Sequence, residues 1–363
     1  MKQNGAMTKT EMYGQPASFR AINDTKDAIF ATLDEVFRKG KPYRELLFTG
    51  CGTSLYLAQA SAAAFTACTG IPAKGVPCSE LYFFPEAYIK DGNYLVLPIT
   101  RKSYTTEVRR AIDKVRALPN VTTLAITCDA DSRDYNDYVI LSPETAEDSV
   151  VMTRSFTSMV YLAVLMALYV GGKDEELKKL DQYPEMAQRV LEGSDALAQK
   201  IIAEHPELNL FITLGQGIYY GIANECMNKM KEMGLTNSEA YYDLEYRHGP
   251  MSLVDDKTLI VCLSHRVSRE ADVDLLTQMK GYGAIVAVLG EELGNAFSGC
   301  ADYVYSLDEG YGELLDAPVI GLIGQTLGLA IAAAKGLDAD TPRHLSQAIV
   351  LSNALLLYFS FLL

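Results

Sequence analysis

Short apolar runs alternate with helical segments along most of this chain, and this alternation constrains the fold more than any other feature. In the first half the apolar runs are 46–50, 93–100, 122–128 and 138–141. Between and after them lie segments with helical character, at 54–68, 105–118 and 153–169. Strands that are apolar on both faces and separated by helices are typical of a parallel sheet covered on both sides. The first half is therefore predicted to be an α/β unit.

The second half repeats this order after a polar segment at 171–184. Its apolar runs are 208–215, 259–264, 284–289 and 303–307, and its helical segments are 218–233, 268–281 and 318–335. Two similar units in tandem indicate an internal repeat. We predict an N-terminal arm at 1–30, helical or loose, and units at 31–180 and 181–340. A C-terminal loop with an apolar tail is predicted at 341–363.

The amino-acid composition restricts the ligands, partners and cellular location that can be expected for this chain. The 363 residues carry a formal net charge of −14, which argues against nucleic acid but not against a small anion in a favourable pocket. The seven cysteines and four histidines form no C-x-x-C pair and no metal-ligand spacing, so reduced thiols and no metal are expected. No signal-peptide pattern opens the sequence. The apolar run 348–363 is shorter than the ~20 residues of a spanning helix. We therefore expect a cytoplasmic protein with no membrane span, whose tail packs against the body or a partner subunit.

Two strand-to-helix loops of the first half are rich in hydroxyl groups. The first reads Thr-Gly-Cys-Gly-Thr-Ser at 49–54, and the second contains hydroxyls and two cations at 99–107. Phosphate is bound by backbone N–H groups, hydroxyls and positive charge at a helix N-terminus. The alternative is local capping of the following helix. The candidate ligand-binding residues are Gly52, Thr53, Ser54, Thr100, Arg101, Lys102, Ser103 and Thr105.

The stretch 225–250 gathers groups that can move protons. Glu225, Lys229 and Glu232 occupy positions i, i+4 and i+7 of a helical segment, so their side chains share one face. His248 follows in a segment that ends in Gly-Pro. Such groups are required for general acid–base catalysis. The same spacing also fits ion pairs on a surface helix, and spacing alone favours that interpretation.

These motifs together resemble a known family. The 49–54 loop and Met152–Thr157 resemble segments of sugar isomerase (SIS) domains. The pattern E-x(3)-K-x(2)-E followed by S-E-A-Y and E-Y-R-H-G-P is the most specific match, and 340–345 resembles the family's C-terminal segment. From about residue 40 to 351 the chain is similar to tandem-SIS proteins. These include the isomerase half of glucosamine-6-phosphate synthase and glucosamine-6-phosphate deaminases.

The resemblance implies a fold and an activity. The expected fold has two tandem SIS domains, each a flavodoxin-like five-stranded parallel sheet flanked by helices, in a homodimer with composite active sites. The expected substrate is a phosphorylated sugar, and no cofactor is expected. The expected activity is isomerisation of a hexose 6-phosphate or deamination of its amino derivative. A deglycase of phosphorylated sugar–amino acid adducts and a non-catalytic phosphosugar sensor remain alternatives.

The resemblance also assigns roles. Glu232 matches the base that moves a proton between sugar carbons C1 and C2. His248 matches the ring-opening histidine, usually lent by the neighbouring subunit. Glu225 and Lys229 match charged groups around the base, and Thr53 and Ser54 match hydroxyls at the sugar phosphate. Gly52, Thr153 and His344 are further candidate substrate contacts.

Two departures from the family pattern concern binding. The family's phosphate loop reads S-x-S-G-x-T, whereas here Lys102 replaces a hydroxyl and Ser103 replaces the glycine that permits close backbone approach. We therefore expect phosphate recognition to be altered, with Lys102 supplying charge. In the C-terminal loop Gln347 stands where the synthase has a lysine. A Schiff base at that position is excluded.

Overall fold

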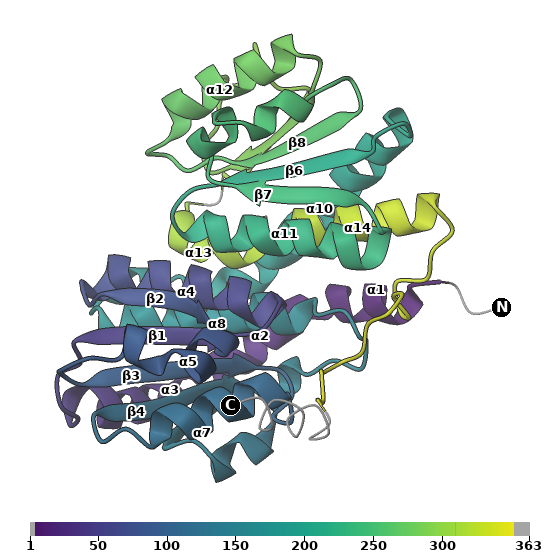
Figure 1. Cartoon of the computed structure of the whole chain (residues 1–363). Coiled ribbons are helices and arrows are strands. Elements are labelled where there is room, and N and C mark those ends of the chain that lie inside the picture. Colours follow the sequence, from purple (N-terminus) through teal and green to yellow (C-terminus); the bar gives the residue numbers. More distant parts are fainter. Residues whose placement is uncertain (1–3, 309, 352–363) are drawn as a thin grey trace.

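The computed structural model describes residues 4–308 and 310–351, and it contains two parallel sheets of five strands each (Figure 1). The first sheet has the order β2-β1-β3-β4-β5 and the second has the order β10-β9-β8-β6-β7. Numbered within its own domain, each sheet has the flavodoxin-like order 2-1-3-4-5. The predicted fold class is confirmed. The strands are β1 (Glu45–Gly50), β2 (Ala73–Pro77), β3 (Tyr94–Thr100), β4 (Val121–Thr127), β5 (Tyr138–Leu141), β6 (Leu210–Gly215), β7 (Asn237–Tyr241), β8 (Thr258–Leu263), β9 (Ile285–Gly290) and β10 (Tyr303–Ser306).

The apolar pattern missed one strand in each domain, β2 and β7. Both lie at a sheet edge, next to β1 and β6 respectively. Their sequences, Ala-Lys-Gly-Val-Pro and Asn-Ser-Glu-Ala-Tyr, are short and largely polar. Edge strands tolerate proline, charge and polar side chains because one side of the strand is unpaired. The eight central and far-edge strands were recognised because they are apolar.

Helices cover both sheets. The longer ones are α4 (Thr53–Thr69), α7 (Thr106–Arg116), α8 (Arg154–Val170), α10 (Tyr183–Glu204), α11 (Ile218–Gly234), α12 (Arg269–Gly281), α13 (Glu313–Ile320) and α14 (Leu322–Ala334). The last predicted helix begins five residues earlier than expected and is interrupted at Gly321. Glu313–Ala334 is long and apolar enough to cross a membrane, but 83% of its apolar window is buried in the fold, as in a core helix. Most of the predicted apolar tail lies outside the described residues.

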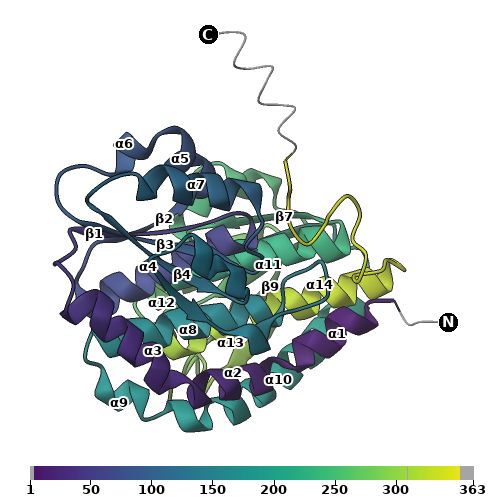
Figure 2. The ribbon, with the colours of Figure 1, turned by 90° about the horizontal axis from the view of Figure 1, so that it is seen from below.

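The N-terminal segment is helical and packs against the body of the protein. It forms α1 (Ala6–Tyr13), α2 (Gln15–Asp24) and α3 (Lys26–Leu33), which run along α8 and α10 (Figure 2). The buried Phe19 ring lies 5.0 Å from Tyr161 and 5.3 Å from Tyr183, between ring centroids. The remaining helices are short: α5 (Cys78–Phe83), α6 (Pro85–Tyr88) and α9 (Asp174–Leu177). The domain boundaries proposed above stay predictions.

The two domains meet where α4 crosses α11 (Figure 1). Gly221 of α11 lies at this crossing. A Cβ atom there would be 2.6 Å from both the Ala60 nitrogen and the Tyr56 oxygen of α4. Backbone atoms cannot move aside as a flexible side chain can. The absence of a side chain at residue 221 is therefore what lets the two helices approach.

Gly221→Ala is expected to destabilise the protein by about 1–3 kcal/mol, because the added methyl group forces α4 and α11 apart. Thermal and denaturant unfolding measure this loss. Gly281→Ala, at the end of α12, is the matched control, since its Cβ atom would meet nothing within 4 Å. Equal stability of the two variants would contradict the packing argument.

Candidate active site

A cavity of about 250 Å³ opens at the carboxyl edge of the first sheet. Parallel α/β sheets place ligands at this edge. The loops after β1 and β3 form one side, Glu232 reaches in from α11 of the second domain, and the C-terminal segment closes another side. The lining residues are Cys51, Gly52, Thr53, Ser54, Thr100, Arg101, Lys102, Thr105, Val108, Val150, Met152, Glu232 and 345–349.

The charged row of α11 ends at this cavity. The ammonium group of Lys229 is fully buried and lies 3.1 Å from a Glu225 oxygen. It also donates a hydrogen bond to Oε2 of Glu232, whose side chain is 21% exposed. The amide of Asn228 donates to the other Glu232 oxygen at 3.0 Å. Both carboxylate oxygens of Glu232 are thus held by donors while the side chain stays accessible from the cavity.

Burial sets the protonation of the two inner members of this row. Burial raises the pKa of Glu225 to about 8, with Lys229 opposing and Glu232 adding to the shift. Neither Glu225 oxygen has the geometry of a hydrogen bond, despite the 3.1 Å ion pair. Burial lowers the pKa of Lys229, but the two carboxylates outweigh it and the net shift is upward. Lys229 therefore stays charged beside Glu232.

The first hydroxyl loop is joined directly to this row. The hydroxyl oxygen of Thr53 accepts hydrogen bonds from Lys229 at 3.3 Å and from Asn228 at 3.1 Å. Because its oxygen receives two donors, its own proton can be directed to a ligand. Gly52 has φ of 55° and ψ of −126°, a conformation that favours glycine, and it precedes α4. Ser54 follows in the first turn of that helix and lines the cavity.

The second hydroxyl loop is partly folded onto itself. The hydroxyls of Thr100 and Thr105 both donate to the Lys102 carbonyl, at 2.7 and 3.3 Å. Ser103 is buried, and its N–H donates to Asp129. Ser103 is not among the residues that line the cavity. Lys102 lines the cavity and forms no ion pair within the part of the chain that the structure describes.

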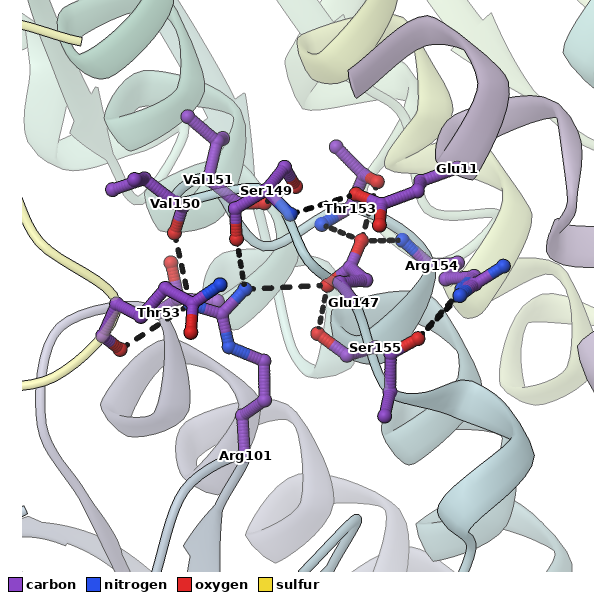
Figure 3. Close-up of polar contacts among 12 residues, drawn as sticks. Glu11, Thr53, Arg101, Glu147, Ser149, Val150, Val151, Thr153, Arg154 and Ser155 are labelled. Carbon is purple, nitrogen blue, oxygen red and sulfur yellow. Dashed lines mark hydrogen bonds and ion pairs between the residues drawn. The ribbon is translucent and has the colours of Figure 1, made fainter. Parts of the chain in front are cut away.

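Arg101 is buried, and both terminal nitrogens of its guanidinium group donate hydrogen bonds (Figure 3). It donates to the carbonyl oxygens of Ser149 and Val150 at 3.0 and 2.9 Å, and it lies 3.6 Å from a Glu147 oxygen. Arg101 is thus one of the residues that line the cavity, and its guanidinium group holds the segment 147–150 in place. Its role as a ligand-binding residue stays a prediction.

Three further candidates lie away from the cavity lining. Thr153 is buried, and its N–H and hydroxyl both donate to Glu147 (Figure 3). His344 is exposed, with a left-handed φ of 65°. His248 is exposed at the end of the short 3₁₀ turn Leu244–Arg247. Within the described part of a single chain, Glu232 and the two hydroxyl loops line the same cavity, whereas His248 is not among the lining residues.

Sequence reasoning missed two residues that organise the site. Asn228 holds both Glu232 and Thr53, and its position four residues before Glu232 could have indicated this contact. Glu147 accepts hydrogen bonds from three successive residues at the start of α8 (Figure 3). Its segment has no periodicity, so no local signal indicated it.

Comparison with known proteins places this geometry in a family. The profile of the SIS domain matches residues 42–170 and 209–329, which is more than half of the chain and covers most of both sheets. The chain belongs to the SIS domain family. Each SIS domain here contains one five-stranded sheet, and the candidate active site uses loops of the first SIS domain and a helix of the second.

Relatives of this SIS protein include enzymes of phosphosugar metabolism. Glutamine–fructose-6-phosphate aminotransferase (isomerizing) of Sulfurisphaera tokodaii is 28% identical over 91% of this chain and 54% of its own length. The chain thus spans about half the length of that relative. Glucosamine-6-phosphate deaminase from Thermotoga maritima, whose crystal structure is known, is 28% identical to this chain. The two structures match with a TM-score of 0.75 over 92% of this chain and 99% of the deaminase. Tagatose-6-phosphate ketose/aldose isomerase from Escherichia coli shares the fold, with a TM-score of 0.83 at 22% identity and coverage of 96% of both chains.

Glu225 makes the stability of the protein depend on pH. Its ordinary pKa is 4.5, and burial raises the pKa to about 8. Between these values the folded protein retains a proton that the unfolded chain releases, so wild-type stability falls as pH rises. In Glu225→Gln this cost is absent. The free energy of unfolding of the variant relative to wild type should therefore increase between pH 5 and 8, by up to about 1.4 kcal/mol per pH unit.

Chemical denaturation at several pH values measures this difference. Glu86→Gln removes an exposed carboxylate from α6 and serves as the control. A difference between Glu225→Gln and wild type that does not change with pH would contradict a protonated, buried Glu225.

Proposed function

We propose that this protein is an aldose–ketose isomerase or amino-sugar deaminase that acts on a hexose 6-phosphate of the fructose 6-phosphate or glucosamine 6-phosphate type. The observation that carries the proposal is the Glu232 carboxylate. It is held by Lys229 and Asn228 and reaches a cavity lined by hydroxyl loops. Membership of the SIS family and the phosphosugar enzymes among the relatives support the same reaction class.

Glu232 would act as the base. Interconversion of aldose and ketose removes a proton from the carbon next to a carbonyl and returns it to the neighbouring carbon, through an enediol. A single carboxylate within hydrogen-bond reach of both carbons can perform both transfers. Lys229 and Asn228 each donate a hydrogen bond to the Glu232 carboxylate and hold it in place at the cavity. With an amine on C2, the same proton transfers lead to an imine that water hydrolyses, releasing ammonia.

The phosphate group would be held by the first-domain loops. Thr53 and Ser54, at the start of α4, line the cavity and would supply hydroxyl groups. Because Arg101 is occupied by Glu147 and two carbonyl groups, Lys102 would supply the positive charge. This arrangement agrees with the substitution of a lysine for a hydroxyl in this loop.

Ring opening would require a second subunit. A neutral imidazole suits proton transfer between the ring oxygen and O1 near neutral pH. His248 is exposed and lies outside the cavity lining of its own chain, as is expected of a group that serves a neighbouring site. The proposed active unit is therefore a homodimer with two composite sites.

Glu232→Gln should reduce turnover of fructose 6-phosphate or glucosamine 6-phosphate by at least about 100-fold, because the amide cannot accept a proton. Product formation is followed by chromatography, with fructosyl-amino-acid 6-phosphates tested in parallel. Lys231→Gln, an exposed change on the same helix, is the control. Turnover that survives Glu232→Gln would contradict the mechanism. Binding without turnover by wild type would indicate a sensor, and cleavage of the adducts alone a deglycase.

Mixing two inactive variants tests the composite site. Glu232→Gln and His248→Ala homodimers each lose one group from both sites. A mixed dimer combines the intact Glu232 of one subunit with the intact His248 of the other. Random exchange of subunits should therefore restore about one quarter of wild-type activity. Unchanged, near-zero activity after verified subunit exchange would contradict a site shared between subunits.

A further inference from the structure

Two cysteines lie side by side next to the cavity. Gly50 of β1 and Pro77 of β2 are the last paired residues of two parallel strands, and Cys51 and Cys78 are the residues that follow them. Neighbouring strands are about 4.8 Å apart, within the roughly 4.4–6.8 Å between Cα atoms that a disulfide requires. The Cys51 side chain also packs against the apolar cluster that contains Cys78.

The contact makes the two thiols unequal. The Thr49 hydroxyl donates a hydrogen bond to the Cys78 sulfur at 3.4 Å. The neighbouring Cys51 thiol and this hydroxyl lower the pKa of Cys78, although burial opposes them. The neighbouring Cys78 sulfur and burial raise the pKa of Cys51. Cys78 is thus the sulfur that more readily becomes a thiolate, which is the nucleophilic form.

Cys51 is the member of the pair that a small molecule in the cavity can reach. Cys51 is half-buried and lines the cavity, whereas Cys78 is buried behind it. The other five cysteines are buried, and none lines the cavity. A small oxidant that enters the cavity therefore reaches Cys51 first. The sulfur of Cys78 then lies next to the oxidised sulfur.

We propose that Cys51 and Cys78 are a site of reversible oxidation that controls the first hydroxyl loop. When the Cys51 proton passes to the adjacent Cys78 sulfur, the Cys51 thiolate attacks hydrogen peroxide and becomes a sulfenic acid. The hydroxide released from the peroxide takes that proton back from Cys78 and becomes water. The Cys78 thiolate attacks the Cys51 sulfur, forms the disulfide and displaces hydroxide, which takes up the proton that Cys78 lost on becoming a thiolate. In total two thiols and one peroxide give one disulfide and two water molecules. A dithiol reductant reverses the reaction.

The disulfide would act on ligand binding through the backbone, and this consequence rests on the proposed function. An S–S bond of about 2.05 Å is shorter than any contact between two thiols, so its formation draws Cys51 toward Cys78 and away from the cavity. Cys51 is joined to Gly50, where a Cβ atom would be only 2.5 Å from the Ser54 backbone. Movement of Cys51 is therefore transmitted to Thr53 and Ser54, which would hold the sugar phosphate.

The test uses the full-length protein, first reduced and then treated with equimolar hydrogen peroxide. Peptide mass spectrometry should show Cys51 joined to Cys78 in wild type. Cys68→Ser, which removes a buried thiol elsewhere, should give the same cross-link. Cys78→Ser should give none, and dimedone should label its Cys51 instead. By calorimetry, the affinity of the cross-linked wild type for fructose 6-phosphate should fall about tenfold and recover on reduction.

Absence of the 51–78 cross-link in wild type would overturn the oxidation site. A cross-linked protein that binds fructose 6-phosphate as the reduced protein does would overturn control of the loop. A reduced protein that binds no sugar phosphate contradicts the proposed function instead, and the mass spectrum then still decides the oxidation site. The two failures are thus distinguishable.

Discussion

The buried ammonium group of Lys229 connects the two domains at the point where chemistry is proposed. Burial of an unpaired charge costs several kcal/mol, and here the Glu232 carboxylate and the adjacent carboxyl group of Glu225, both on the same helix, offset that cost. The same ammonium group donates to Thr53, the first residue of α4 in the other domain. Lys229, together with Asn228, therefore holds Glu232 and the first hydroxyl loop in a fixed relation. This contact exists only because α4 and α11 approach closely at Gly221. The position of the proposed base thus depends on helix packing between the domains, and not on the loops alone.

The second domain repeats the backbone of the site without its chemistry. Gly217 precedes α11 with φ of 54° and ψ of −125°, nearly identical to Gly52 before α4. After β8, however, the Ser264 hydroxyl donates to Asp272, and the neighbouring Arg266 pairs with Glu291 at 2.6 Å. The end of the second sheet is thus lined by carboxylates, which disfavour a phosphate. The fold occurs twice in the chain, but under the proposed function only the first copy would bind the phosphate. The second domain contributes to the cavity of the first through α11, which contains Lys229 and Glu232.

Features of this structure that depend on residues close together in the sequence can be predicted from the sequence. Features that depend on contacts between distant residues cannot. Apolar central strands such as β3 follow from local pattern, whereas the edge strand β7 does not, because its stability comes from pairing with β6. The i, i+4, i+7 spacing predicts that Glu225, Lys229 and Glu232 share a face. It does not predict their burial, which is imposed by α4 and α14 packing against that helix. Arg101 was interpreted as a ligand because its partner Glu147 is distant in sequence and lies in a segment without regular structure. Such contacts become visible only in three dimensions.

The C-terminal segment has a specific relation to the proposed phosphate site. The N–H of Thr106, the first residue of α7, donates to the Ile349 carbonyl at 3.1 Å, and the Thr106 hydroxyl accepts from the N–H of Leu351. A helix N-terminus can bind phosphate, and in this structure the Ile349 carbonyl accepts one N–H group at the N-terminus of α7. A phosphate oxygen forms a charge-assisted hydrogen bond about twice as strong as one to a neutral carbonyl. Under the proposed function, a bound sugar phosphate would compete for this N–H with the advantage of charge, and Lys102 would add to it. The replacement of a loop hydroxyl by lysine is then understandable, because the substrate has to displace a segment of the chain itself.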